Sequence, residues 1–151
     1  MKLKMTQEEK MLLIKDLSAR LPYAVTVEHT SGFRGTLHDM TVHHMYDDND
    51  NVYDAICYTD FFGDEDSIYI EYFKPYLFPL SSMTEEQLKD VKASLHQELI
   101  DIYENGSEER KVPEYPQTWY YVQDWYNAHH FDYRGLIEKG LAIDATGLNI
   151  Y

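Results

Sequence analysis

The sequence predicts a single α+β domain in which a strand-rich middle, about residues 23–73, lies between helical ends. Apolar residues recur with helical spacing near the N-terminus and after residue 84, whereas they alternate in the strand-like way between them. Strands this close in sequence favour a small antiparallel sheet or a partial barrel flanked by an N-terminal helix and C-terminal helices. The chain has 151 residues, which is the usual size of one domain, so we expect residues 1–151 to fold as one unit.

A helix is expected over Thr6–Arg20. Thr6 and Glu9 have the spacing of a capping box, in which each side chain binds the other's backbone N–H. Pro22 ends the helix, because the residue before a proline is pushed out of the α region. The helical apolar positions are Met11, Leu13, Ile14, Leu17 and Leu21.

The middle of the chain predicts five strands separated by polar turns. Two prolines then end the sheet, so that Lys74–Leu80 is expected as an extended segment outside it. The expected strands are 23–27, about Phe33–Met40, Val42–Tyr46, Val52–Thr59 and Ser67–Phe73.

A second helix is expected over Thr84–Tyr103, with a capping box formed by Thr84 and Gln87. Asn105-Gly106 ends it. A third helix over Gln117–Ala128 and a short helical turn over Leu136–Leu141 follow. The buried stripe of the second helix is expected to contain Leu88, Val91, Leu95, Leu99 and Ile102.

The composition excludes intrinsic disorder, since 44% of the residues are hydrophobic and 15% are aromatic. Fourteen of the aromatic residues are tyrosines. A tyrosine has an apolar ring and a polar hydroxyl, so this usage fits both a thin core with half-buried positions and a contact surface for a partner.

The charge is strongly acidic, with 13 Lys and Arg against 27 Asp and Glu and a net charge of −14. Such a chain repels phosphates and anionic lipid, so no direct nucleic-acid or membrane partner is expected. No Lys or Arg lies between Arg34 and Lys74. This acidic segment serves as a solvated face, a cation site or a docking face for a basic protein. Its acids are Asp39, Asp47, Asp48, Asp50, Asp54, Asp60, Asp64, Glu65, Asp66 and Glu71.

Cys57 is the only cysteine, so no disulfide within the chain and no thiolate zinc cluster can form. It lies in an apolar run and is expected to be a small buried hydrophobe. The N-terminus is polar and no apolar run approaches the length of a membrane span, which predicts a cytoplasmic protein.

No motif indicates a metal or another cofactor, and none of either kind is expected. The polar run Asp47–Asn51 is not an EF-hand loop, because the sixth and twelfth positions are Val52 and Tyr58. Adjacent histidines, as at positions 43–44 and 129–130, diverge and do not chelate one ion. Glycine-rich phosphate-binding motifs and serine-hydrolase motifs are absent from the sequence.

The densest mixture of functional side chains lies in Trp125–Arg134. One interpretation is a helix end, in which the two histidines face the negative end of the helix dipole and Asp132 and Arg134 hold the next turn. Others are a ligand or partner site with aromatic walls, and a catalytic site. The candidate binding residues are Trp119, Trp125, His129, His130, Asp132 and Arg134.

Two stretches, residues 74–87 and 124–145, resemble a group of short acidic proteins from Bacteroides-group gut bacteria and their phages and mobile elements. They cover about a quarter of the chain. The resemblance implies a bacterial, phage-related cytosolic origin, and carries over no activity, ligand or site.

Three functions follow from these observations. The first is a non-enzymatic binding or adaptor protein that acts through protein–protein contacts, supported by the tyrosines, the acidic face and the absence of a catalytic motif. The second is an acidic inhibitor that mimics DNA and blocks a DNA-handling protein. The third is a small enzyme built around His129–Arg134.

Overall fold

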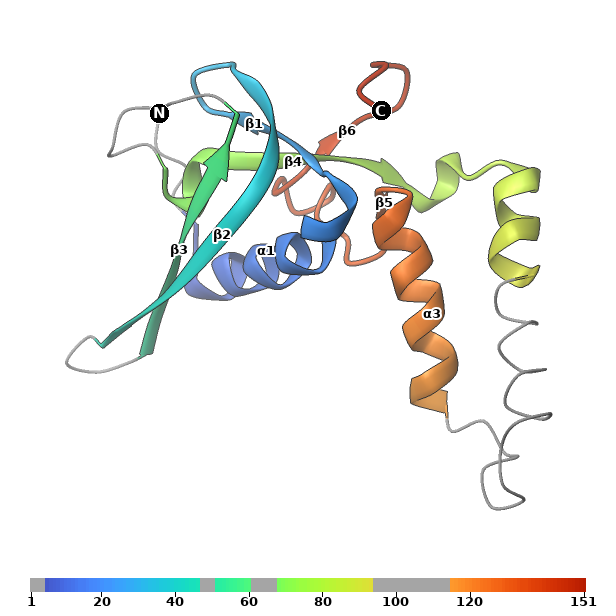
Figure 1. The fold of residues 1–151 in the computed structure, drawn as a ribbon, viewed down its shortest axis with the longest axis horizontal. Helices are drawn as coiled ribbons and strands as arrows, with labels where there is room; N and C mark the ends of the chain where they lie inside the picture. The colour runs from blue at the N-terminus through green and yellow to red at the C-terminus, as the bar shows by residue number, and fades with distance from the viewer. Residues whose placement is uncertain (1–4, 47–50, 61–67, 94–114) are drawn as a thin grey trace.

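A computed structural model of the protein describes residues 5–46, 51–60, 68–93 and 115–151. Within strands and helices, only the backbone is described at residues 44–46, 51–53 and 115–121. A helix near the N-terminus and helices in the C-terminal half flank a mixed sheet that does not close into a barrel (Figure 1). The α+β class predicted from the sequence is therefore confirmed.

Helix α1 covers Gln7–Arg20, as predicted, and begins with the expected capping box. The Glu9 N–H donates to the Thr6 hydroxyl at 3.2 Å, and the Thr6 N–H donates to the Glu9 carboxylate at 2.9 Å. A 3₁₀ turn, η1 (Leu21–Tyr23), follows and contains Pro22. The first strand therefore begins later than predicted.

The sheet has the strand order β3-β2-β1-β4-β5, and β6 pairs with β4 outside this path. Pairing is antiparallel from β3 to β4, whereas β5 and β6 are parallel to β4. The strands are β1 (Thr26–His29), β2 (Arg34–Tyr46), β3 (Asn51–Thr59), β4 (Phe73–Pro79), β5 (Phe131–Asp132) and β6 (Ile143–Asp144).

Strand β2 is one long strand where the sequence predicted two. It pairs with β3 from Leu37 opposite Thr59 to Tyr46 opposite Asn51, with a bulge between Leu37 and Asp39. The predicted break fell at Thr41, which instead continues the ladder opposite Ile56. Strand β3 confirms the strand predicted for Val52–Thr59.

Strand β4 corrects the prediction that the sheet ends before Lys74. It lies inside the sheet although it contains two prolines. The N–H of Thr30, which follows β1, donates to the Tyr72 carbonyl. Backbone groups of successive residues point alternately to the two sides of a strand, so the Pro75 nitrogen points away from β1. Because β6 pairs only from Tyr76 onwards, no ladder hydrogen bond is lost at Pro75.

The strand predicted for Ser67–Phe73 was wrong. Ser67 lies outside the described residues, Tyr69 makes a single bridge to Ile56, and Ile70–Tyr72 forms the 3₁₀ turn η3. Ile70 and Glu71 are both buried in this turn, so burial does not alternate between neighbouring residues as it does in a strand with one buried face.

Residues 85–93 are helical, and the rest of the predicted second helix lies outside the described residues. Its capping box is present, since Gln87 N–H donates to the Thr84 hydroxyl at 3.2 Å and Thr84 N–H to the Gln87 amide oxygen at 2.9 Å. Val91 is buried as predicted, but Leu88 is 45% exposed, so the stripe was wrong at that position.

Helix α3 (Tyr115–Ala128) confirms the third predicted helix, and a short 3₁₀ turn, η4 (Leu80–Ser82), precedes the second. The predicted helical turn after Leu136 is a single hydrogen-bonded turn. The Leu141 N–H donates to the Leu136 carbonyl and the Gly140 N–H to the Ile137 carbonyl, with Gly140 at φ 72°. This is a Schellman closure, which favours glycine at that position.

The core lies between α1 and the sheet. It includes Cys57, which is buried as predicted, and burial together with the charge of Asp54 raises the pKa of its thiol to about 12. Among the described residues, no helix has the length and apolar character needed to cross a membrane. The core residues are Leu13, Ile14, Leu17, Val25, Val27, Leu37, Ala55, Cys57, Ile70, Phe73, Leu77, Leu136, Leu141 and Ala142.

Candidate functional site

Trp125 stacks with two other rings of the protein. His129 stacks on it at 3.9 Å between ring centroids, and Phe131 stacks on it at 5.7 Å. The His129 Nδ1 lies 2.9 Å from the Trp125 carbonyl oxygen, which can only accept, so Nδ1 carries the proton. Trp119 lies in α3, and its side chain lies outside the described part of the chain.

His130 stacks on the ring of Tyr151, with 3.6 Å between centroids and 5° between planes. Burial, and then the positive charge of Arg20, lower the pKa of His130 to about 4. It is therefore neutral near pH 7, so His130 adds no positive charge at the negative end of the helix dipole. Its Nδ1 is buried and has no partner among the described residues.

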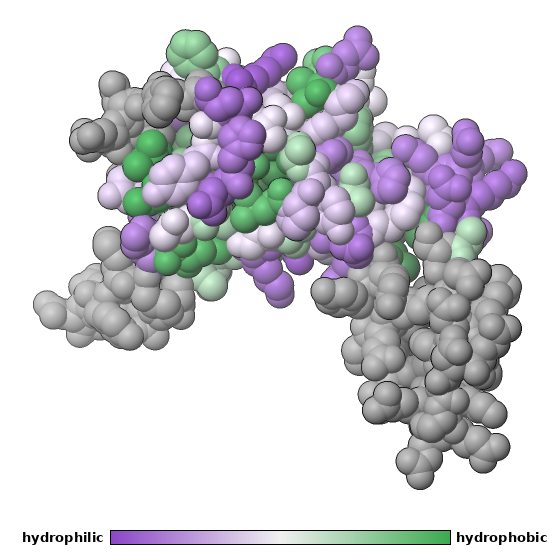
Figure 2. Space-filling model, in the orientation of Figure 1, coloured by the Kyte–Doolittle hydropathy of each residue, from purple (hydrophilic) through white to green (hydrophobic). Residues whose placement is uncertain are grey.

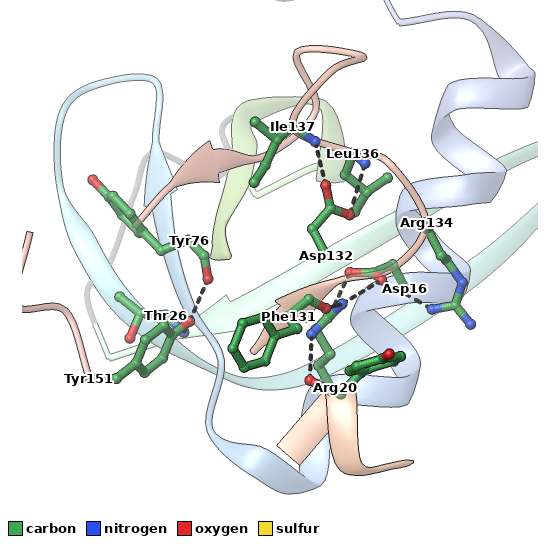
Figure 3. Close-up of polar contacts among 11 residues, drawn as sticks. Asp16, Arg20, Thr26, Tyr76, Phe131, Asp132, Arg134, Leu136, Ile137 and Tyr151 are labelled. Carbon is green, nitrogen blue, oxygen red and sulfur yellow. Dashed lines mark hydrogen bonds and ion pairs between the residues drawn. The ribbon is translucent and has the colours of Figure 1, made fainter. Parts of the chain in front are cut away.

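Asp132 is buried and holds the turn that follows it (Figure 3). Its two carboxylate oxygens accept hydrogen bonds from the N–H groups of Leu136 and Ile137, both at 2.9 Å. The carboxylate is thus engaged by backbone donors, in agreement with the interpretation that this residue fixes the next turn.

Arg134 reaches α1 and joins a buried ionic cluster (Figure 3). Its Nη1 lies 3.0 Å from Asp16 Oδ1. The Arg20 guanidinium binds the same carboxylate at two points, Nε to Oδ2 at 2.8 Å and Nη2 to Oδ1 at 3.1 Å. Arg20 also donates to the Phe131 carbonyl at 2.6 Å, and the side chains of Asp16 and Arg20 are completely buried.

The sequence analysis missed Asp16 and Arg20, although a signal for them exists. They share one helix face with the fully buried Leu13 and Leu17, at positions i, i+3, i+4 and i+7. A charged pair at i, i+4 inside an apolar stripe indicates a buried ion pair, because an unpaired charge there would be too costly.

A second buried ionic cluster joins α1 to the acidic segment. Lys10 Nζ lies 3.5 Å from a carboxylate oxygen of Asp54 and 3.5 Å from one of Glu71, with all three side chains at most 13% exposed. Two of the ten acids between Arg34 and Lys74 therefore face the protein interior. Of the other eight, Asp39 and Asp60 are exposed, and six lie outside the described residues.

The outer part of the β2–β3 hairpin forms a surface that we call the ribbon face. It comprises Asp39, Thr41, His43, Ile56 and Tyr58, whose side chains share one side of the two strands. Asp54, opposite His43, lies on the same side, but it is only 13% exposed and binds Lys10. Tyr58 is 46% exposed and lies directly opposite Asp39, and Thr41 and His43 are also exposed. In Figure 2, hydrophobic and hydrophilic residues intermix on the face of the molecule in view.

In the described part of the chain, no three His, Cys, Asp or Glu residues are grouped in a way that could hold a metal ion. The structure describes the side chains of five of the six predicted site residues, all except Trp119. These five do not form one open pocket wall, because Trp125, Asp132 and Arg134 contact other parts of the protein and only His129 of the five is exposed. Whether any of them binds a ligand stays a prediction.

Comparison with known proteins adds no relative, since no family model, curated protein or solved structure matches the chain. The fold and the candidate surfaces thus define an acidic α+β domain with a projecting β-ribbon.

Proposed function

We propose that this is a non-enzymatic, cytoplasmic binding protein that acts through protein–protein contacts, and that the ribbon face is its contact surface. The observation that carries the proposal is the length of the ribbon. Strand β1 pairs with β2 only as far as Thr36, and from Asp39 to Tyr46 the only strand that β2 pairs with is β3. Among the described residues, β3 is an edge strand of the sheet.

A two-stranded ribbon is marginally stable in water by itself. Helix α1 covers part of the side opposite the ribbon face, where Ala55 and Cys57 are buried, but Val42 on that same side is 44% exposed. The ribbon therefore extends past its cover, as Figure 1 shows. A partner that covered the ribbon face would bury the ring of Tyr58, which the protein itself leaves 46% exposed.

Tyr58 is the expected centre of the contact. Tyrosine is enriched among the residues that dominate binding energy, since its ring buries a large area and its hydroxyl keeps a polar contact. The partner is expected to be basic, because the chain has a net charge of −14 and no Lys or Arg lies between Arg34 and Lys74. Opposite charges speed the encounter and suppress wrong partners.

The two alternatives receive less support. A DNA mimic needs its carboxylates on the surface, and Asp54 and Glu71 instead bind Lys10. An enzyme built around His129–Arg134 needs free groups, and the carboxylate of Asp132 is engaged by backbone donors while Arg134 binds Asp16. The bacterial, phage-related origin implied by the resemblance remains a prediction.

Site-specific photo-crosslinking tests the proposal. A photoreactive benzoylphenylalanine at position 58 replaces one aromatic ring with another, and the control carries it in place of Leu148, which has similar exposure at 45%. In lysate of the native cell, position 58 should give a discrete adduct with a basic protein. Excess unlabelled wild-type protein should compete with the adduct, and the Tyr58→Asp variant should not.

The adduct should also weaken between about 0.05 and 0.5 M NaCl, because exposed charges are screened over a Debye length. The same adducts at both positions, or none at position 58, would argue against the ribbon face. Displacement of duplex DNA from the captured protein would support the inhibitor alternative instead.

A further inference from the structure

The side chain of Arg134 is mostly buried, and its guanidinium makes one hydrogen bond among the described residues. Its side chain is 15% exposed, and its Nη1 donates to Asp16 Oδ1 at 3.0 Å. Figure 3 shows the rest of the guanidinium pointing away from Asp16. Since an arginine has five N–H donors, most of its hydrogen-bonding capacity is unused there.

The charges around Asp16 do not balance locally. Two guanidiniums, those of Arg20 and Arg134, converge on the single carboxylate oxygen Asp16 Oδ1. The carboxylate of the neighbouring Asp132 accepts from two backbone N–H groups instead. In the described part of the chain, no other carboxylate forms an ion pair with Arg134. A largely buried cation that shares its one carboxylate with a second cation favours the approach of an anion.

Tyr133 supplies a second unsatisfied donor next to the first. The guanidinium carbon of Arg134 lies 4.6 Å from the centroid of the Tyr133 ring, and that of Arg20 lies 5.6 Å from it. The Tyr133 hydroxyl is buried and has no hydrogen-bond partner among the described residues. Buried hydroxyls are normally paired, so an unpaired one on a ring that lies against two guanidiniums points to an acceptor supplied from outside the chain.

We propose that Arg134 and Tyr133 bind a small anion that carries a carboxylate or a phosphate group. The planar fork of an arginine matches the oxygens of both groups, and charge-assisted hydrogen bonds of this kind are about twice as strong as neutral ones. Asp16 holds Arg134 in place, and Arg20 supplies the second positive charge behind it. This site lies on different elements from the ribbon face and does not depend on the proposed partner.

Thermal unfolding with inorganic phosphate or acetate as the probe tests the site, with NaCl keeping the ionic strength constant. A ligand that binds only the folded state raises the melting temperature, and above its Kd the rise grows with the logarithm of the ligand concentration. Wild type should show such a rise with at least one of the two anions, and the larger rise identifies whether phosphate or carboxylate is preferred. The Nε–H signal of Arg134 in a ¹⁵N NMR spectrum should shift over the same concentration range.

Three variants make the test specific. Tyr133→Phe removes only a hydroxyl and should weaken the apparent Kd by about tenfold or more. Arg134→Gln should abolish the rise. Arg34→Gln removes an equal charge from an arginine that binds Tyr76 instead, and should leave the rise intact. No rise in wild type would overturn the proposal. An equal rise in Tyr133→Phe or Arg134→Gln would also overturn it, because such a rise would be a general salt effect.

Discussion

Asp16 is the residue that links the N-terminal helix to the end of the chain. Its carboxylate binds Arg20 four residues along α1 and Arg134 on the segment after β5, 118 residues away in the sequence. Among the described residues, Asp16 is the only carboxylate with which Arg20 and Arg134 form an ion pair. A buried carboxylate in this position acts on tertiary structure, because its loss leaves two cations unpaired.

Replacing Asp16 by Asn should therefore destabilise the protein by about 3–5 kcal/mol, the range for breaking a buried ion pair. Urea unfolding gives the free energy of unfolding directly. Glu138→Gln is the matched control, because this exposed acid should change it by less than about 0.5 kcal/mol. Equal effects of the two variants would show that the buried cluster is not formed.

His130 should make the protein less stable in mild acid. The pKa of this side chain is lowered to about 4 in the folded state from its ordinary value of 6.5. Between these two values the unfolded chain binds the proton more readily than the folded one, so the free energy of unfolding falls as the pH decreases from 6.5 to 4. Above pH 6.5 this contribution is constant.

His130→Asn removes the titrating group and tolerates the left-handed backbone at φ 62°. Urea unfolding at several pH values should show a shallower loss of stability in this variant than in wild type between pH 6.5 and 4. Parallel curves for the two proteins would contradict the effect assigned to His130.

At the scale of elements, local signals in the sequence were the most reliable. Both capping boxes, helices α1 and α3, the described part of the second helix and strand β3 could be predicted, because each depends on residues a few positions apart. Strand β4 was missed because prolines normally exclude a central strand, and only its pairing with β1 and β6 shows why Pro75 is tolerated. The partner of Arg134 could not be predicted, since periodicity carries no information on contacts between distant segments.

The cap of the second helix can be measured separately. Thr84→Ala should lower the free energy of unfolding by about 1 kcal/mol, the usual cost of a lost N-cap, because the Gln87 N–H loses its acceptor. Thr84→Ser keeps the hydroxyl and should remain close to wild type. If both variants unfold at the same urea concentration as wild type, the capping box contributes nothing to stability.

For the whole molecule, the net charge of −14 should make stability depend on salt. Exposed like charges repel one another over about a Debye length, roughly 10 Å at 0.1 M salt. The melting temperature should therefore rise with NaCl from low concentration and then level off. A melting temperature that falls with NaCl would show that attractive ion pairs outweigh this repulsion.

The affinity of the crosslinked partner for the Tyr58→Ala variant decides whether the ribbon face is a protein contact surface. Loss of a central tyrosine should weaken binding by about thirtyfold, corresponding to 2 kcal/mol, whereas Leu148→Ala should bind as wild type does. Both variants should retain the melting temperature of wild type, because both side chains are partly exposed. Equal affinities of Tyr58→Ala and wild type would contradict the account.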